Sequence, residues 1–392
     1  MKWLAARESG KFEDFAPHLE EVVHLVRDKA QLLGQSRNLS PYDALVDEFS
    51  PGLTSAEIDT VFKGMARRLP GMIRDVLARQ EQRPVLPIVG KFSVGKQRAL
   101  AVDIMKAVGF PFDRGRLDES EHPFTEGVPG DVRVTTRFDT SEPFTGLLGA
   151  LHETGHAMYD VGLPPEFTDQ PVGRDRGMAL EESQSLLMEM MVCRSRAFVS
   201  YLRPLLEKHF GVTGPEWSEE NLYALLTRVK RGAIRVDADE LTYSLHIQLR
   251  YELENQLLDG KLAVRNLRDA WNAGMERLLI KPQNDLEGVL QDVHWAVGSF
   301  GYFPSYALGS VMAAQFFEAL RQSVPDVEGQ IARGDFSGLM GWLRENVHRQ
   351  GARVSPQELL KNATGKPLTA AAALRYLEGK YLEDQAVGSA AA

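Results

Sequence analysis

Apolar residues recur at helical intervals along most of the chain. In the segment "FEDFAPHLEEVVHLVRDKAQLLG" they mark one face from Phe15 to Leu32, and Gly34 can end the helix. The same spacing in "TSAEIDTVFKGMARRL" predicts a helix that Pro70 and Gly71 would end, and "SVGKQRALAVDIMKAVGF" predicts a third. Further helices are expected over residues 147–161, 178–209, 218–231, 239–258, 264–279, 286–298, 304–322, 336–348, 356–362 and 369–380.

The pattern changes between residues 111 and 145, which are rich in Pro, Gly, Asp and Thr. Within them, "GRLDES" and "DVRVTTRF" show the alternation and the β-branched residues that are typical of two short strands. We therefore expect a mainly α fold, with one large helical domain over residues 1–392 and a small β element at about 111–140. The edge of such a sheet, lying beside a helix, can align an extended peptide.

Charge and composition exclude several classes of protein. The chain is 43% hydrophobic and 25% charged, with a formal net charge of -9, so it lacks the basic surface of a nucleic-acid binder and the polybasic patch of a membrane-surface binder. No run of 18 apolar residues predicts a membrane span, and the start "MKWLAARESGKFEDF" lacks the apolar core of a secretory signal. Cys193 is the single cysteine, which excludes an intrachain disulfide and a thiol-rich metal site. We expect a cytoplasmic protein that binds neither nucleic acid nor membrane.

The segment "LHETGHAMYD" contains the pattern His-Glu-x-x-His, formed by His152, Glu153 and His156. On a helix, residues i and i+4 share a face, so both histidines can present a ring nitrogen to one ion. Zinc lowers the pKa of its bound water toward about 7, and the neighbouring carboxylate can take a proton from that water as it attacks a carbonyl. The alternative is a helix with two ordinary surface or core histidines. Gly155, which would let another backbone come close, favours the metal site.

A third metal ligand must come from elsewhere in the chain. Tyr159 and Gly162 stand where an H-x-x-G-x-x-H extension would need glycine and histidine, so that class of metal site is excluded. The segment "MALEESQSLLMEM" carries Glu181, Glu182 and Glu189 among apolar residues, where a carboxylate is costly to bury unless it is paired or binds a metal. One or two of these could instead face solvent or cap a helix. Spacing alone does not choose between Glu181 and Glu182.

A series of motifs in order resembles one known family. The motifs are "HPF" at 122–124, "DVRVT" at 131–135, "HETGH" at 152–156, "EESQS" at 181–185, "IRVDAD" at 234–239, "GVLQDVHW" at 288–295 and "GYFPSYALG" at 301–309. Together they resemble the Taq-type (thermostable carboxypeptidase) family of zinc metallocarboxypeptidases over essentially the whole chain. The resemblance implies a gluzincin-type helical body around a substrate groove, with a metal-binding core at about 144–310. It also implies broad specificity, a homodimer, and Co²⁺ as a possible substitute for Zn²⁺.

Two departures from the family pattern bear on function. The family usually has His-Glu-Ser-Gln in the third-ligand motif, and Glu181 stands in the place of that histidine. Glu182 matches the family's ligand, so the resemblance assigns the ligand role to Glu182, while Glu181 could alter metal affinity and the basicity of the site. The N-terminal helices that typically precede "FAPHLEEVV" look shortened or missing, which would leave a more open groove.

The other motifs offer residues that could bind substrate. An enzyme that removes C-terminal residues must bind a free carboxylate, and arginine can do so with a bidentate pair. Arg235 is the first candidate and Arg133 the second, although acidic neighbours make a structural ion pair the alternative for each. Gln291 could hold a substrate amide. An oxyanion also needs hydrogen-bond donors besides the metal. The candidates, whose alternative role is aromatic core, are His294, Tyr302 and Tyr306.

The combined interpretation is a zinc metallocarboxypeptidase that releases C-terminal amino acids from peptides with a free C-terminus. His152, His156 and Glu182 bind the ion, and Glu153 is the general base on a metal-bound water. Three alternatives remain open. An endopeptidase or oligopeptidase with an opened groove would also cut a peptide blocked at its C-terminus. A non-catalytic, metal-bound peptide-binding protein would have no use for Glu153. A helical scaffold without metal would leave the ordered motifs unexplained.

Overall fold

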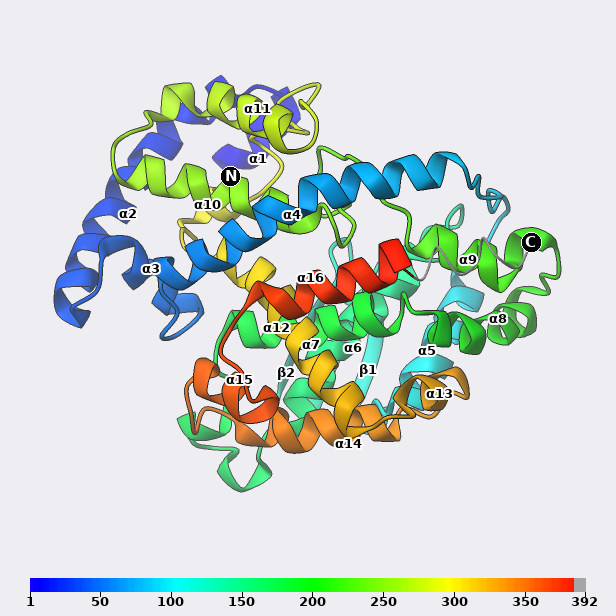
Figure 1. The fold of residues 1–392 in the computed structure, drawn as a ribbon. Helices are drawn as coiled ribbons and strands as arrows, with labels where there is room; N and C mark the ends of the chain where they lie inside the picture. The colour runs from blue at the N-terminus through cyan, green and yellow to red at the C-terminus, as the bar shows by residue number, and fades with distance from the viewer. Residues whose placement is uncertain (384–392) are drawn as a thin grey trace. The chain divides into compact units, whose positions relative to one another are not determined.

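The computed structural model describes residues 1–383, and residues 384–392 of the predicted domain lie outside the described residues. The described chain forms two compact units (Figure 1). The first unit contains residues 1–79, 229–308 and 369–383, and the second contains residues 80–228 and 309–368. The single domain expected from the sequence stays a prediction. Across residues 1–383, no helix combines the length and the apolar character needed to cross a membrane.

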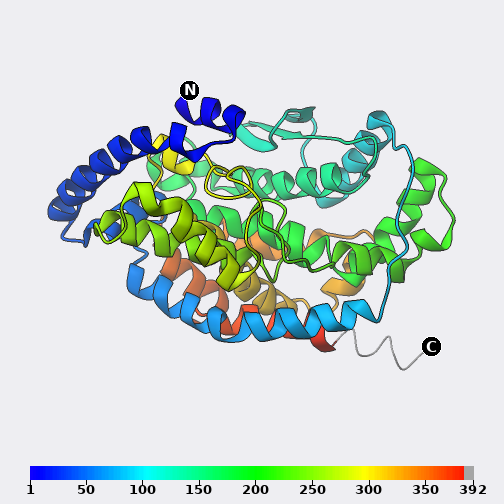
Figure 2. The same ribbon diagram turned by 90° about the horizontal axis from the view of Figure 1, so that it is seen from above.

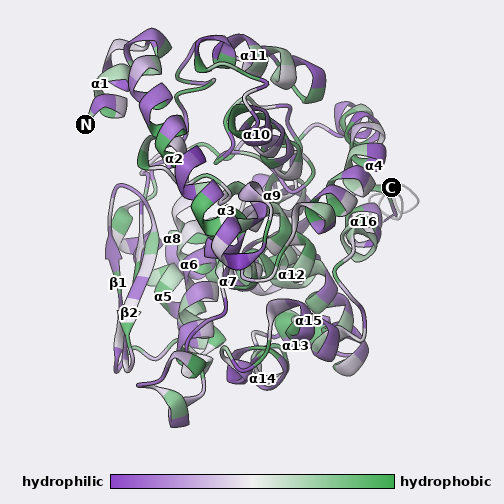
Figure 3. Cartoon of the chain, turned by 90° about the vertical axis from the view of Figure 1, so that its left-hand side faces the viewer, coloured by the Kyte–Doolittle hydropathy of each residue, from purple (hydrophilic) through white to green (hydrophobic). Residues whose placement is uncertain are grey.

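The first unit is built from helices. Its long helix α4 runs beside α16, as Figures 1 and 2 both show, and Arg68 of α4 forms an ion pair with Glu378 of α16. Helices such as α2 and α11 carry both hydrophobic and hydrophilic residues (Figure 3), as expected when one face packs inward. The helices are α1 (Lys2–Ser9), α2 (Ala16–Arg37), α3 (Pro41–Phe49), α4 (Ser55–Glu81), α10 (Tyr243–Leu258), α11 (Leu267–Leu278), the start of α12 (Phe303–Ser323) and α16 (Ala370–Glu378).

Helix α4 corrects one prediction, because it continues through Pro70, where the sequence predicted its end. Pro70 is exposed, so its ring does not disturb the packed face of the helix. Leu69 before the proline and Met72 and Val76 after it are all buried. Apolar burial on both sides outweighs the backbone hydrogen bond that proline cannot donate.

The second unit combines helices with one small sheet. The strand order is β1-β3-β2, with β1 parallel and β2 antiparallel to the central strand β3. Leu117, Val132 and Val134 are buried, and Thr136 donates a hydrogen bond to the Gly146 carbonyl of α6, which packs against the sheet. The elements are α5 (Val94–Val108), β1 (Gly115–Glu119), β2 (Phe124–Val128), β3 (Asp131–Thr136), α6 (Thr145–Gly162), α7 (Met178–Leu186), α8 (Arg196–Phe210), α9 (Glu219–Leu226), the rest of α12, α13 (Val327–Ala332), α14 (Ser337–Asn346) and α15 (Pro356–Thr364).

The mainly α fold with a small β element at about 111–140 is confirmed, whereas several element boundaries differ from the prediction. The strands expected in "GRLDES" and "DVRVTTRF" are β1 and β3, but β2, α3 and α13 were not expected. The predicted helix 178–209 is interrupted by a π-helical turn at Leu187–Val192, after which Ser195 caps α8. The helix predicted over 286–298 is wrong, because among those residues only the short 3₁₀ turn His294–Val297 is helical.

Candidate metal centre and active-site residues

Helix α6 carries the His-Glu-x-x-His motif of the second unit. Its apolar residues Leu147, Leu151 and Met158 are buried, which fixes the rotation of the helix. His152 and His156 lie one turn apart, with ring centroids separated by 5.2 Å. The two imidazoles therefore lie on one face of α6, as their spacing predicted.

Gly155 lets α7 approach this part of α6 closely. A Cβ atom at Gly155 would lie 2.6 Å from the Gln184 carbonyl oxygen and 2.6 Å from the Ser185 Cα atom, so a side chain does not fit there. The prediction that this glycine admits another backbone is confirmed. On the other side of α7, a Cβ atom at Gly309 would lie 2.9 Å from both the Cβ and the Cγ atoms of Glu182. Two glycines thus allow α7 to bring Glu182 to the histidines.

Three side chains form a candidate metal centre. One ligand atom from each of His152, His156 and Glu182 lies within 4.8 Å of the other two. The Nε2 atom of His156 is 3.8 Å from Oε2 of Glu182, whereas Glu181 approaches the opposite ring nitrogen, with its Oε1 3.5 Å from Nδ1. Two imidazole nitrogens and one carboxylate oxygen are ligands that suit zinc and similar divalent transition metals. The donor set therefore fits such an ion.

The electrostatics around α6 favour a cation. Burial alone would lower the pKa of His152, but the hydrogen bond to Glu189 and the charges of Glu182, Glu189 and Glu153 outweigh burial and raise this pKa to about 9. Burial and the nearby His152 lower the pKa of His156 to about 3, so its imidazole is neutral at pH 7 and can act as a ligand. The carboxylates that stabilise the extra proton on His152 would also stabilise a metal ion that binds instead of that proton.

Glu153 is buried beside the histidines and contacts one residue that the sequence analysis missed. The hydroxyl oxygen of Thr125 lies 2.7 Å from Oε2 of Glu153 and 2.9 Å from its backbone oxygen. Burial raises the pKa of Glu153, while the charge of His152 and the hydrogen bond from Thr125 lower it. Thr125 lies on strand β2, which the sequence did not predict. Its position directly after the "HPF" motif is the signal in the sequence that could have identified it.

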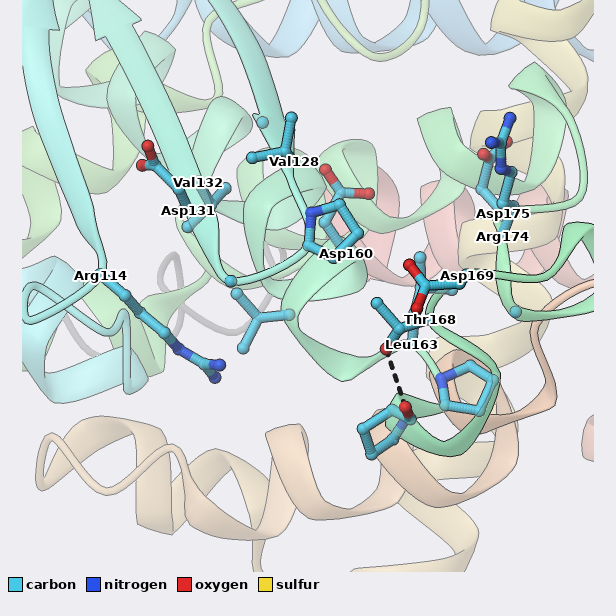
Figure 4. Close-up of a pocket in the computed structure, with 17 residues that line it drawn as sticks. Arg114, Val128, Asp131, Val132, Asp160, Leu163, Thr168, Asp169, Arg174 and Asp175 are labelled. Atoms are coloured by element: carbon cyan, nitrogen blue, oxygen red, sulfur yellow. Dashed lines mark hydrogen bonds between the residues drawn. The ribbon is translucent and has the colours of Figure 1, made fainter.

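An acidic pocket of about 580 Å³ lies beyond the C-terminal end of α6 (Figure 4). Asp160, one helical turn after His156, lines it together with Asp169, Asp175 and Arg114. Burial and the charge of Asp175 raise the pKa of Asp160 to about 6. Burial, followed by the charges of Asp175 and Asp160, also raises the pKa of Glu181 to about 8. Glu181 thus lies in the first turn of α7, partly exposed, with its carboxylate among other carboxylates and beside His156.

A second group of candidate residues lies in the first unit, around Asp292. Arg235 is 8% exposed, and its Nε and Nη2 atoms lie 2.9 and 2.8 Å from Oδ1 of Asp292. The fully buried Arg250 binds the other oxygen, with its Nε 2.7 Å from Oδ2. Burial opposes ionisation of Asp292, but the two guanidinium groups lower its pKa. Two positive charges therefore share one carboxylate, which leaves this buried cluster with an excess positive charge.

Gln291 is part of the same cluster, and both ends of its amide bind protein groups. Its Oε1 atom accepts hydrogen bonds from the Arg235 backbone nitrogen and from Arg250, each at 2.8 Å. Its Nε2 atom donates to the carbonyl oxygens of Ala233 and Glu287. These bonds hold the loop that carries Arg235, and the expected contact of Gln291 with a substrate amide stays a prediction.

The three aromatic candidates lie together in the first unit. His294 Nε2 is 3.1 Å from the Tyr306 hydroxyl oxygen, and the ring centroids of Tyr302 and Tyr306 are 5.1 Å apart. Burial lowers the pKa of His294 to about 4, so its ring is neutral at pH 7. The Arg235 guanidinium lies over the Tyr306 ring, 4.9 Å from its centroid. Arg235, His294 and Tyr306 thus form one contiguous group.

Arg133 does not share this environment. It lies on β3 in the second unit, with 56% of its side chain exposed, and forms an ion pair of 2.8 Å with Asp131 on the same strand. This is the structural alternative that its acidic neighbour indicated. A substrate contact of Arg133 stays a prediction.

Known proteins match the sequence of this chain over nearly all of its length. Residues 1–381 match the carboxypeptidase Taq (M32) metallopeptidase family. Carboxypeptidase 1 of Bacillus subtilis is 36% identical over 381 residues, which cover 97% of this chain and 76% of the relative. Thermostable carboxypeptidase 1 of Thermus thermophilus is 37% identical with the same coverage.

Solved structures that resemble this chain are also carboxypeptidases. Metallocarboxypeptidase 1 of Trypanosoma cruzi has a TM-score of 0.95 and 39% identity, covering 97% of this chain and 77% of that one. The M32 carboxypeptidase of Deinococcus radiodurans has a TM-score of 0.91 and 38% identity, covering 98% and 77%. With a family match over nearly the whole described chain, this protein belongs to the carboxypeptidase Taq (M32) family and is a peptide-hydrolysing metallocarboxypeptidase.

Proposed function

We propose that the chain is a zinc-dependent carboxypeptidase of broad specificity, in which His152, His156 and Glu182 bind the ion and Glu153 is the general base. The observation that carries the proposal is the cluster of three ligand atoms within 4.8 Å, two of them from α6, the helix that also carries Glu153, and one from α7. Co²⁺ is proposed as a substitute for Zn²⁺ because the same nitrogen and carboxylate ligands suit both ions.

The chemistry divides between the ion and the residues of α6. A bound zinc ion polarises the peptide carbonyl and lowers the pKa of a water molecule. Glu153 takes a proton from the attacking water and then delivers it to the leaving amine, which is the role of a general base followed by a general acid. The hydrogen bond from Thr125 stabilises the ionised form of Glu153 that can accept this proton.

Selection of the C-terminus is assigned to Arg235. Its cluster holds two guanidinium groups and one carboxylate, so a substrate carboxylate would balance the excess positive charge. His294 and Tyr306, together with the neighbouring Tyr302, are proposed to donate hydrogen bonds to the oxyanion, because a neutral imidazole and a phenol keep their protons near pH 7. Arg133 and Gln291 remain secondary candidates for substrate contacts.

The cellular setting is also part of the proposal. The substrates are peptides with a free C-terminus, and a cytoplasmic location agrees with a single, buried cysteine. We further propose a homodimer. Size measurement by light scattering tests this point, and a monomer at micromolar concentration would contradict it.

The test of function is a pair of peptides that differ at one end. One has a free C-terminus and its twin is amidated, and each is incubated with the zinc-loaded wild type or with Glu153→Gln. Mass spectrometry should show a ladder of single-residue losses from the free peptide alone. Glu153→Gln should lower the rate about 10²–10⁴-fold while retaining zinc, because it removes proton transfer but no metal ligand. Internal cuts in both peptides would instead support an endopeptidase.

A further inference from the structure

Glu189 lies in the wall of the candidate metal centre, and the proposed mechanism leaves it without a role. It belongs to the π-helical turn Leu187–Val192, which continues from α7, the helix that carries Glu182. Single π-helical turns often occur at functional sites, because the extra residue changes which side chains face a neighbouring element. The Glu189 side chain is 14% exposed, and a carboxylate that is mostly buried requires strong partners.

Each oxygen of Glu189 has a different partner. Oε2 lies 2.9 Å from Nδ1 of His152, and Oε1 accepts a hydrogen bond of 2.7 Å from Nη2 of Arg194. Arg194 is itself held by a 3.0 Å hydrogen bond from Nη1 to the carbonyl oxygen of Leu226 in α9. The carboxylate is therefore fixed between an arginine anchored on another helix and one of the candidate metal ligands.

This arrangement determines which nitrogen of His152 carries the proton. An ionised carboxylate can only accept hydrogen bonds, so the proton between Glu189 and His152 sits on Nδ1. The lone pair of the neutral imidazole is then on Nε2, the nitrogen that remains to bind an ion. His156 lacks an equivalent bond of this length, since its Nδ1 lies 3.5 Å from Oε1 of Glu181.

We propose that Glu189, held in place by Arg194, is a positioning residue that fixes the tautomer and the ring orientation of His152 and thereby sets the affinity of the metal centre. The inference rests on the proposed metal ligands and deepens that function. A purely structural pair of Glu189 and Arg194 would need no contact with His152. Here one oxygen of the Glu189 carboxylate contacts His152 and the other contacts Arg194.

The experiment measures zinc affinity, which does not depend on catalysis. Zinc dissociation constants are obtained by competition with a chromophoric chelator for the wild type, Glu189→Gln and Glu220→Gln. Glu220 is a matched control, because it also pairs with an arginine, Arg196, but is 76% exposed and belongs to an ion pair outside the metal centre. Glu189→Gln should bind zinc roughly 10–100-fold more weakly, since an amide cannot accept from both His152 and Arg194. Glu220→Gln should bind zinc like the wild type.

Two further measurements separate positioning from general destabilisation. The metal-free unfolding midpoint of each variant shows whether Glu189→Gln still folds, and the visible spectrum at saturating Co²⁺ should keep the wild-type intensity because the ligands are unchanged. Arg194→Lys leaves both Glu189 and His152 in place, so it should weaken zinc binding by a smaller factor than Glu189→Gln does. This variant tests the inference if Glu189→Gln does not fold.

The outcomes distinguish this inference from the function on which it rests. Wild-type zinc affinity in both folded variants, Glu189→Gln and Arg194→Lys, would overturn the positioning role and leave the metal centre intact. A wild type that binds no zinc would overturn the proposed metal centre, and the positioning role with it. A loss of affinity equal to the loss in the Glu220→Gln control would also contradict the inference.

Discussion

Thr125 places a hydroxyl group against the proposed general base, Glu153, across 28 residues of sequence. Hydrogen bonding to an ionised carboxylate favours the ionised form, and here it opposes the burial that raises the pKa of Glu153. The base must be ionised to accept a proton from water. We therefore expect this hydroxyl to extend the pH range over which the proposed base is ionised toward lower pH.

Removing this hydroxyl should shift the acid side of the pH profile. In Thr125→Val the pKa of Glu153 rises further, so the acid limb of kcat/KM moves to higher pH. Peptide hydrolysis measured between pH 5 and 9 tests the direction of the shift. Thr125→Ser keeps the hydroxyl and serves as the control, and identical acid limbs in the valine and serine variants would refute the role of Thr125.

A second prediction at the residue scale concerns Arg235. Replacement by lysine keeps one positive charge but loses the planar fork that binds Asp292 through two nitrogens and that could bind a substrate carboxylate. We expect kcat/KM for a peptide with a free C-terminus to fall about 10–100-fold, chiefly through KM. Arg277→Lys, which changes a half-exposed pair with Glu252 in the same unit, is the control. Equal kinetics in the two variants would exclude Arg235 from substrate binding.

At the scale of elements, the metal centre depends on how closely α6 and α7 pack. Gly155 brings the Gln184 and Ser185 backbone within a distance that a β-carbon would forbid. Helix α7 places Glu182 near His156, and the π-helical turn that follows α7 places Glu189 near His152. The separation of these two elements therefore sets the distance between Glu182 and the two histidines of the candidate metal centre, and the contact between Glu189 and His152.

Gly155→Ala should separate the two elements. We expect a loss of about 1–3 kcal/mol in the free energy of unfolding, as for other overpacked sites, together with weaker zinc binding. Urea unfolding and chelator competition measure the two effects. Gly95→Ala in α5 is the matched control, because a β-carbon there meets no atom within 4 Å. If both alanine variants were equally stable and bound zinc equally well, close packing at Gly155 would not support the metal centre.

At the scale of the whole molecule, a buried carboxylate ties distant parts of the chain together. Glu254 of α10 accepts hydrogen bonds from the Tyr42 hydroxyl, the Trp295 indole and the Gly301 backbone nitrogen. Burial raises the pKa of Glu254 from 4.5 to about 7, although these bonds and the charge of Arg250 oppose the increase. The folded chain therefore holds a proton here that the unfolded chain releases at a lower pH.

This proton makes stability depend on pH in a defined direction. A pKa that is higher in the folded state gives a stabilising contribution that is complete below pH 4.5 and is lost as the pH rises through about 7. The difference in unfolding free energy between the wild type and Glu254→Gln should therefore change in favour of the variant from pH 5 to pH 8. Urea unfolding at four pH values measures this difference. A difference that stays constant over the range would show that Glu254 does not titrate in the folded state.

The amino-acid sequence by itself determined the features that depend on local spacing. Positions four apart placed His152 and His156 on one face of a helix, an apolar stripe predicted the helical body, and short motifs in order identified the family. These properties follow from helix geometry and from residue types in a short window, so they can be derived without knowledge of distant contacts.

The tertiary structure alone decided which side chains meet across long separations. It placed Glu182, rather than Glu181, at Nε2 of His156, joined His152 to Glu189 across 37 residues, and joined Arg235 to Asp292 across 57. It also carried α4 through Pro70, and it left only a short 3₁₀ turn in the segment 286–298, where a helix was predicted. The physical reason is that burial and charge pairing are set by the packing of whole elements, and their free energies outweigh the local preferences that a sequence pattern records.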